Sequence, residues 1–168
     1  MSSEQTSKHR RGLFKIETFK NFEAVFNCHP FRLKPGEDLK QEISSFVNQN
    51  HIEAGWIGCC VGSLTRYNIR FANQGSGSTA SGHFEIVSLT GTVSIHGCHL
   101  HISVSDEKGK TVGGHLLDGN IIYTTAELVI MSTDEYIFNR VEDPITSWKE
   151  LEIRKRSGEN SGKTDLTQ

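Results

Sequence analysis

Proline and long apolar runs are scarce in this chain of 168 residues. It has 3 prolines against 16 glycines, a composition typical of a β-rich fold with many turns. No apolar run approaches the roughly 18 residues that a membrane-spanning helix needs, and the polar N-terminus lacks the pattern of a signal peptide. We therefore expect one domain without a membrane anchor, located in the cytoplasm, with the nucleus as the other candidate compartment.

An excess of charge is also lacking. The formal net charge is −2, with acidic and basic residues mixed along the chain, so electrostatics gives no reason to expect nucleic-acid binding. The cysteines form no C-x-x-C pair, which favours reduced thiols over a disulfide framework. They are Cys28, Cys59, Cys60 and Cys98.

The two ends of the chain are polar. We predict a disordered arm over 1–20, a folded domain over 21–155 and a disordered tail over 156–168. The arm contains the basic cluster Lys8-His9-Arg10-Arg11. Such a cluster is more often a solvated arm than a nuclear-localisation or nucleic-acid contact segment, although the pattern fits both.

The body alternates between strand patterns and one helix pattern. Glu37 and Asp38 precede an apolar stripe at helical spacing, which consists of Leu39, Ile43, Phe46 and Val47. A glycine- and serine-rich stretch over 73–82 predicts a flexible loop. Strands are expected from about Phe22 to Pro35 and over 52–64, 67–71, 84–89, 99–104, 121–131, 136–140 and 148–154.

Alternation is clearest in the segment around residue 100. Successive side chains of a strand point to opposite faces, so Leu100, Ile102 and Val104 share one face while His99 and His101 share the other. The apolar face is expected to pack into a core. The two imidazoles would then project away from it.

A turn follows this strand at Asp106-Glu107-Lys108-Gly109, where glycine suits a positive φ. A three-residue loop would place His115 opposite His101, with His99 as the diagonal neighbour. Opposed Cβ atoms lie about 4.5–5.5 Å apart and diagonal ones about 7–8 Å. The register therefore gathers three imidazoles on one face of a hairpin.

Three such imidazoles are a candidate site for a divalent metal, since zinc accepts nitrogen ligands at about 2.0–2.1 Å. Two other interpretations stay open. A bulge at Gly113-Gly114 would turn His115 to the opposite face, and the three histidines would also suit a polar cleft or a subunit contact.

An ordered set of motifs resembles one family, the PPC domain (plant and prokaryote conserved domain). In plants this domain follows AT-hooks in AT-hook motif nuclear-localised proteins, and the stand-alone form is prokaryotic. The similarity covers roughly 22–154. The motifs are Phe31-Arg-Leu-Lys-Pro-Gly-Glu-Asp-Leu39, Gly62-Ser-Leu64, Gly82-His-Phe-Glu-Ile86, Ser88-Leu-Thr-Gly-Thr92, His99-Leu-His101, Gly113-Gly-His-Leu116 and Thr124-Thr-Ala-Glu127.

The resemblance implies an α+β fold, a mostly antiparallel β-sheet flanked by helices, similar to the acetolactate decarboxylase fold group. It also implies a homotrimer. In metal-containing relatives the H-L-H and G-G-H motifs supply the ligands of zinc or another divalent metal. The matching residues here are His99, His101 and His115.

Two departures from the plant pattern limit the transfer of function. Plant members use a Gly-Arg-Phe-Glu-Ile segment to contact partner transcription factors, whereas this chain has His83 in place of the arginine. The corresponding partner-binding residues are Gly82, His83, Phe84, Glu85, Ile86 and Val87. The AT-hook core is also missing, since Arg10-Arg11-Gly12-Leu13 lacks its second arginine and its proline. Direct binding to DNA is therefore not expected.

The first hypothesis is a homotrimeric, zinc-binding PPC-domain protein of unassigned activity, with a small molecule as an additional ligand. The second is a zinc-dependent hydrolase or lyase acting on a small carboxylated molecule. In that case Glu85 or Glu127 would be the general base and Arg70 would bind the substrate carboxylate. A third is a DNA-associated or transcription-partner-binding module. Whether the protein is an enzyme stays open.

Overall fold

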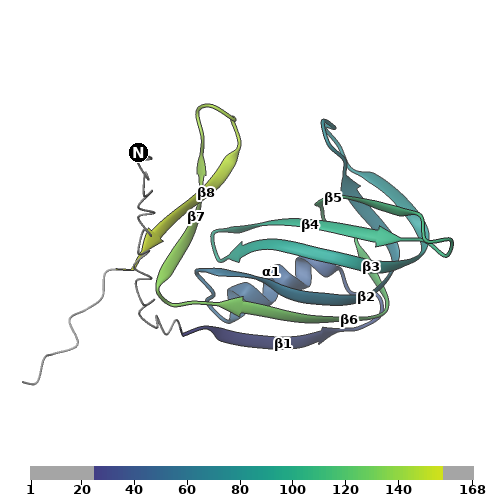
Figure 1. The fold of residues 1–168 in the computed structure, drawn as a ribbon, viewed down its shortest axis with the longest axis horizontal. Coiled ribbons are helices and arrows are strands. Elements are labelled where there is room, and N and C mark those ends of the chain that lie inside the picture. The colour runs from purple at the N-terminus through teal and green to yellow at the C-terminus, as the bar shows by residue number, and fades with distance from the viewer. Residues whose placement is uncertain (1–24, 157–168) are drawn as a thin grey trace, which may run out of the picture.

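The computed structural model describes residues 25–156. The predicted arm over 1–20, its basic cluster and nearly all of the predicted tail lie outside the described residues. Along the chain the elements are β1 (Asn27–Leu33), α1 (Leu39–Gln49), β2 (Gly55–Arg70), β3 (Ser78–Ser94), β4 (Gly97–Ser105), β5 (Thr111–Leu116), β6 (Ile121–Ser132), β7 (Tyr136–Glu142) and β8 (Lys149–Lys155) (Figure 1).

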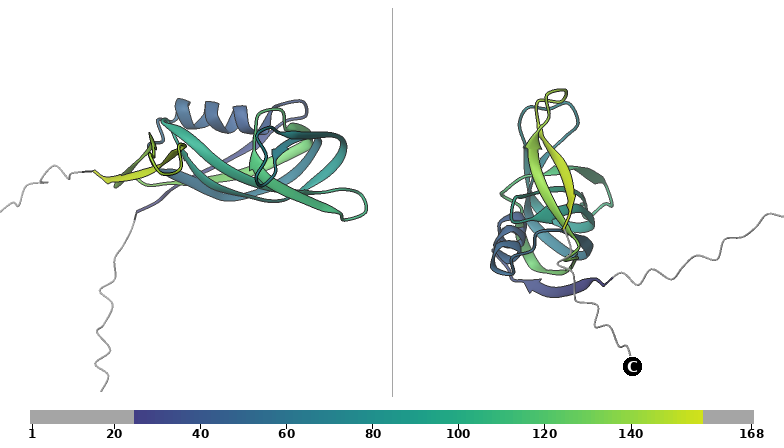
Figure 2. Two further views of the ribbon diagram at one scale, coloured as in Figure 1. Left: turned by 90° about the horizontal axis from the view of Figure 1, so that it is seen from above. Right: turned by 90° about the vertical axis from the view of Figure 1, so that its left-hand side faces the viewer.

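Six strands form one antiparallel sheet in the order β1-β6-β2-β3-β4-β5. The end of β2 also pairs with β5, so β2 to β5 close into a ring. Helix α1 lies along one side of the sheet (Figure 2), and β7 and β8 form a separate two-stranded hairpin beside it (Figure 1). The predicted α+β class with a mostly antiparallel sheet is confirmed.

Flanking helices were expected, but the described chain has a single helix. The closed ring explains the difference, because β2 to β5 bury much of their apolar surface against one another. Only the open side of the sheet needs a helix to cover it. This helix is too short to cross a membrane.

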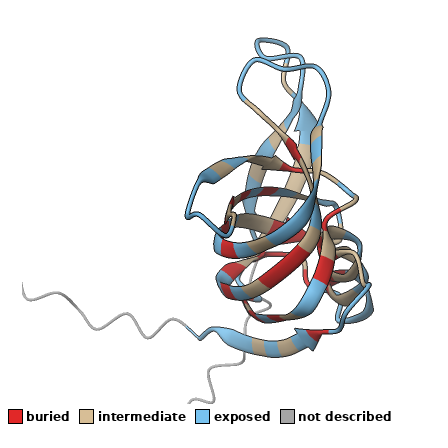
Figure 3. Cartoon of the chain, turned by 90° about the vertical axis from the view of Figure 1, so that its right-hand side faces the viewer, coloured by how far each residue is buried: buried red, intermediate tan, exposed pale blue. Residues whose placement is uncertain are grey.

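The core fills the space inside the ring and beneath the helix, where the buried segments gather in Figure 3. Its largest fully buried side chains are Leu39, Ile43, Leu64, Ile69, Leu100, Ile102, Leu116, Ile122, Leu128, Ile130, Val93 and Val104. Burying an aliphatic side chain contributes about 1.5–3 kcal/mol. These residues therefore dominate the stability of the fold.

Helix α1 begins as its sequence predicts. Asp38 is the N-cap, and its carboxylate accepts hydrogen bonds from the backbone N–H groups of Lys40 and Gln41, which satisfies two otherwise unpaired donors. The predicted stripe faces the core. Its aromatic member Phe46 is only half-buried and stacks on Phe31 with ring centroids 4.2 Å apart.

Two strand predictions are wrong in their boundaries. The expected strands over 52–64 and 67–71 are one strand, β2, whose pairing with β6 shifts register near Gly62 and Leu64. These bulges interrupt the alternation and bend the strand without ending it. The expected loop over 73–82 is also shorter, because β3 begins at Ser78 and pairs its small polar residues with the end of β2.

Candidate metal centre

The β4–β5 hairpin carries the three histidines in the predicted register. His101 lies opposite His115. The turn is closed by a hydrogen bond from Asp106 N–H to the carbonyl oxygen of Lys110 at 3.0 Å. The Asp106 carboxylate accepts from the backbone N–H groups of Lys108 and Lys110, each at 2.9 Å. A well-fixed turn thus sets which side chains share the outer face.

The glycine pair before His115 forms no bulge against β4. Gly113 lies opposite Ser103 and Gly114 opposite Ile102 in uninterrupted pairing. A Cβ atom at Gly114 would lie 2.5 Å from the carbonyl oxygen of Arg70. The missing side chain therefore lets β2 approach β5 closely and complete the ring.

The three imidazoles meet at one point above the sheet. The Nε2 atoms of His99 and His101 lie 3.2 Å apart, and one nitrogen from each of the three rings lies within 4.8 Å of the others. Two nitrogens bound to one tetrahedral zinc at 2.0–2.1 Å are separated by about 3.3 Å. The spacing of His99 and His101 matches that value, and the His115 nitrogen lies within 4.8 Å of both.

The protonation state of His115 also suits a ligand. Burial, and then the positive charge of Arg70, lower the pKa of His115 to about 4. Burial and the neighbouring His101 lower the pKa of His99 as well. The Nδ1 atom of His115 is buried and has no hydrogen-bond partner among the described residues. Neutral imidazoles with a free lone pair are the form that metals bind.

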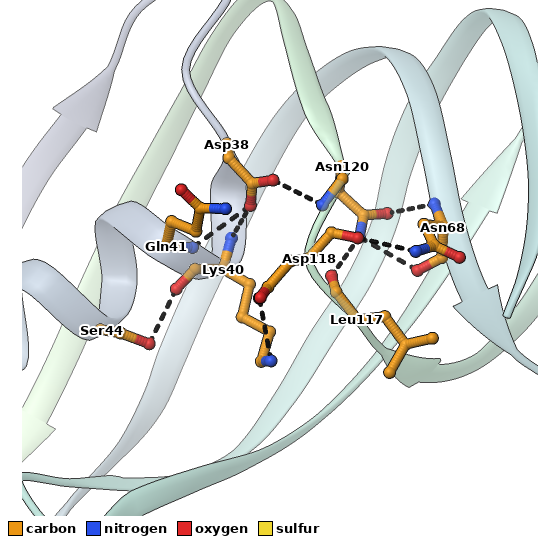
Figure 4. Close-up of polar contacts among 9 residues, drawn as sticks. Asp38, Lys40, Gln41, Ser44, Asn68, Leu117, Asp118 and Asn120 are labelled. Atoms are coloured by element: carbon orange, nitrogen blue, oxygen red, sulfur yellow. Dashed lines mark hydrogen bonds and ion pairs between the residues drawn. The ribbon is translucent and has the colours of Figure 1, made fainter. Parts of the chain in front are cut away.

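A buried amide network holds the end of β5 in place (Figure 4). The Asn120 side chain is fully buried and donates hydrogen bonds to the carbonyl oxygens of Asn68 at 3.1 Å and Leu117 at 2.6 Å. It also accepts one from Asn68 N–H at 3.0 Å. The N-cap Asp38 accepts a further hydrogen bond from Gly119 N–H. The segment after His115 is thus tied to β2 and to the start of the helix.

A cavity of about 670 Å³ lies beside the histidines. The body lines it with Arg70, His99 and His115, and the β7–β8 hairpin adds Arg140, Trp148 and Glu150. These hairpin residues were not predicted as part of the site from the sequence. No local pattern marks them, because only the folded chain brings the hairpin next to β3 and β4.

Of the predicted substrate-binding and catalytic residues, only Arg70 lies at the cavity. Arg70 lies opposite His115 in the β2–β5 pairing and lines the cavity. Glu85 is exposed and pairs with Ser105, which is four residues, or about 13 Å of strand, beyond His101.

Glu127 is exposed on β6 and pairs with Val61 in the middle of β2. Neither glutamate lines the cavity. Their assignment as a base therefore gains no support from the arrangement.

The predicted partner-binding segment lies on β3. His83 is exposed and stacks on Tyr123, with ring centroids 4.3 Å apart. Phe84 instead packs against the core beside Tyr67, while Val87 is 56 % exposed. Four of the six residues of this segment are therefore exposed, and its role stays a prediction.

Fold and site together define a class: a closed antiparallel sheet with one helix on its open side and three imidazoles on its outer surface. The chain matches the model of the Plants and Prokaryotes Conserved (PCC) domain over residues 20–134. It belongs to this family, which is the PPC family of the sequence resemblance. The β7–β8 hairpin, which starts at Tyr136, lies outside the matched residues.

Among curated proteins, the chain is 45 % identical over 127 residues to a protein named Bifunctional protein GlmU from Synechococcus sp. (strain JA-3-3Ab). The match covers 76 % of this chain and 20 % of the relative. The chain thus spans about a fifth of the length of that relative.

Among solved structures, a hypothetical protein from Salmonella enterica superposes with a TM-score of 0.78 at 38 % identity, covering 80 % of this chain and 97 % of that one. A protein from Archaeoglobus fulgidus, described as metal-containing, has a TM-score of 0.65 at 24 % identity, covering 81 % and 99 %. The latter likeness shows the fold alone. The similarity to the acetolactate decarboxylase fold group stays a prediction.

Proposed function

We propose that this protein binds one divalent metal ion, zinc by the nature of its donors, through His99, His101 and His115. The observation that carries the proposal is the 3.2 Å separation of the His99 and His101 Nε2 atoms, together with the unpartnered Nδ1 of the third imidazole. Zinc favours nitrogen donors in a tetrahedral set. The physiological activity of the metal-bound protein is left unassigned.

An open coordination position favours a catalytic role of the metal over a purely structural one. His99 and His101 are exposed, and the cluster holds three histidines rather than the four closed ligands of a structural site. A bound zinc ion would lower the pKa of a water molecule or polarise a carbonyl group. The second candidate function is therefore a zinc-dependent hydrolase or lyase acting on a small carboxylated molecule, supported by Arg70 in the adjoining cavity.

The homotrimer implied by the family is part of the same proposal. Val61 on β2 and Val87 on β3 are 57 % and 56 % exposed, and their strands are neighbours in the sheet. Exposed apolar side chains on adjacent strands suit a contact between copies of the chain. Light scattering of the purified protein measures the mass directly.

The DNA-associated alternative gains no support from the mixed charges of the chain. A transcription-partner role for the Gly82–Val87 segment has only the exposure of His83 and Val87 in its favour. The cytoplasmic location, with the nucleus as the other compartment, stays a prediction.

Metal content tests the main proposal. Untagged protein is purified, and zinc per chain is measured for the parent, His101→Ala, His115→Ala and the control His83→Ala. We expect close to one zinc per chain in the parent and the control, and loss of zinc in both ligand variants with unchanged circular dichroism. A parent protein that carries no metal and takes up no added zinc would contradict the proposal.

A further inference from the structure

Two arginines line the cavity beside the histidines, and neither forms an ion pair with a carboxylate of the described residues. Among the described residues, the ion pairs are Lys40–Asp118, Arg154–Glu152 and Arg156–Glu53. None involves Arg70 or Arg140. Both therefore present to the same space a guanidinium group that is not in an ion pair with a described residue.

Arg70 is held against the wall of the cavity. It lies opposite His115 where β2 pairs with β5, and its guanidinium carbon lies 5.6 Å from the ring centroid of Trp148. A cation over an indole ring is attracted to its face. Because Trp148 belongs to the hairpin, this contact joins the two parts of the chain that enclose the cavity.

Arg140 reaches the cavity from β7. It donates a hydrogen bond from Nη2 to the Thr92 hydroxyl at 2.6 Å, and Thr92 lies opposite His99 in the β3–β4 pairing. The guanidinium group is thereby fixed next to the histidine cluster, with its other donors available. Burial lowers the pKa of Arg140, and a bound anion would offset the cost of removing this cation from water.

The charges around the cavity are mostly positive. The cationic side chains that line it are Arg70, Arg140 and Lys149, against the single carboxylate of Glu150. One oxygen of Glu150 already accepts a hydrogen bond from the Thr146 hydroxyl at 3.0 Å. This local surplus of positive charge contrasts with the net charge of −2 for the whole chain.

We infer that Arg70 and Arg140 form an anion-binding site that selects small molecules with a carboxylate or phosphate group. Guanidinium groups bind both anions through paired hydrogen bonds, and the volume of about 670 Å³ suits a small molecule. The inference deepens the proposed function, since the anion would lie beside the metal. The hairpin outside the family match would then be the part that confers selectivity.

Calorimetric titration with inorganic phosphate and with malonate tests this site. Both probes are added at constant ionic strength to full-length protein, in metal-free and zinc-loaded form. Arg70→Gln and Arg140→Gln should each weaken binding by roughly 10- to 100-fold, because each removes hydrogen bonds to a charged group. The matched control is Arg66→Gln, an exposed arginine of β2 that does not line the cavity.

The two probes separate the ligand classes, since preference for phosphate or for malonate identifies the anion. No binding of either probe to the parent protein, or an equal loss in Arg66→Gln, would overturn the inference. Failure of the metal proposal gives a different result. In that case zinc is absent from the parent, while the metal-free protein still binds anions through both arginines.

Discussion

The body of the protein and its β7–β8 hairpin are built in opposite ways. Strands β1 to β6 bury one face against the core, whereas no residue of β7 or β8 is buried. Ile102 in the body is 1 % exposed, and Ile153 in the hairpin is 57 % exposed. Yet the hairpin supplies four of the residues that line the cavity, namely Arg140, Trp148, Lys149 and Glu150. The core of the body therefore dominates stability, whereas the proposed anion site draws one arginine from each part, Arg70 from β2 and Arg140 from β7.

A small number of mainly polar contacts join the hairpin to the body. Phe138 N–H donates to the carbonyl oxygen of Glu53 at 2.8 Å, and the Ser94 hydroxyl donates to the carbonyl oxygen of Phe138 at 2.7 Å. Arg156 forms an ion pair with Glu53. A hairpin held by a few polar contacts opens more readily than a packed core. Matched substitutions in the two parts measure the difference.

The largest effect is expected in the core. Ile102→Ala should lower the free energy of unfolding by about 2–5 kcal/mol, because it removes apolar contacts and leaves a cavity. Ile153→Ala deletes the same atoms from an exposed position and should change it by less than about 0.5 kcal/mol. Urea denaturation followed by circular dichroism measures both. Equal losses would show that the hairpin is as tightly packed as the body.

A smaller effect is expected in the polar network. Asn120→Ala would remove its three side-chain hydrogen bonds to the part-buried backbone of Asn68 and Leu117, at a cost of about 1–3 kcal/mol. The hairpin counterpart is Asn139→Ala, which removes one hydrogen bond to Glu152. The same denaturation experiment should show little change for this variant. A larger loss in Asn139→Ala would reverse the comparison.

The smallest effect concerns the protonation of the histidines. In metal-free protein His115 should titrate near a pKa of about 4, so it is neutral at pH 7. Arg70→Gln removes a positive charge that disfavours the imidazolium form, and should therefore raise the pKa of His115 towards its usual range.

The substitution of Arg140 on the hairpin is the matched comparison for the substitution of Arg70 on the body. Arg140 contributes to the lowered pKa of His99 and is not among the causes for His115. Arg140→Gln should therefore raise the pKa of His99 and leave that of His115 nearly unchanged. Imidazole signals in NMR spectra recorded across pH report both values. An equal shift of His115 in both arginine variants would contradict the assignment.

Local rules in the sequence predict the histidine hairpin well. Alternation of Leu100 and Ile102 with the histidines identifies the buried face, and the turn at Asp106 fixes the register. The start of helix α1 is equally local, because Asp38 caps it. In each case the deciding interaction joins residues close together in the chain.

Features set by distant contacts escape the same rules. The bulges of β2 disrupt its alternation, so one bent strand has the pattern of two. The placement of Arg140 beside His99 depends on Thr92, a hydrogen-bond partner 48 residues earlier. No periodic pattern records such a contact. His115 could be placed beside His101 from the sequence because a short turn joins their two strands. Arg140 could not be placed, because it lies on β7, far along the chain from the histidines.

X-ray absorption at the zinc edge reports whether three imidazole nitrogens hold the metal. Zinc-loaded protein should show three imidazole nitrogens at about 2.0–2.1 Å and one further light atom. Cys98 also lines the cavity, but it packs against the core and is not part of the histidine cluster, so we expect no sulfur ligand. A scatterer at about 2.3 Å, the length of a zinc–thiolate bond, or fewer than three imidazoles, would contradict a site built from three histidines.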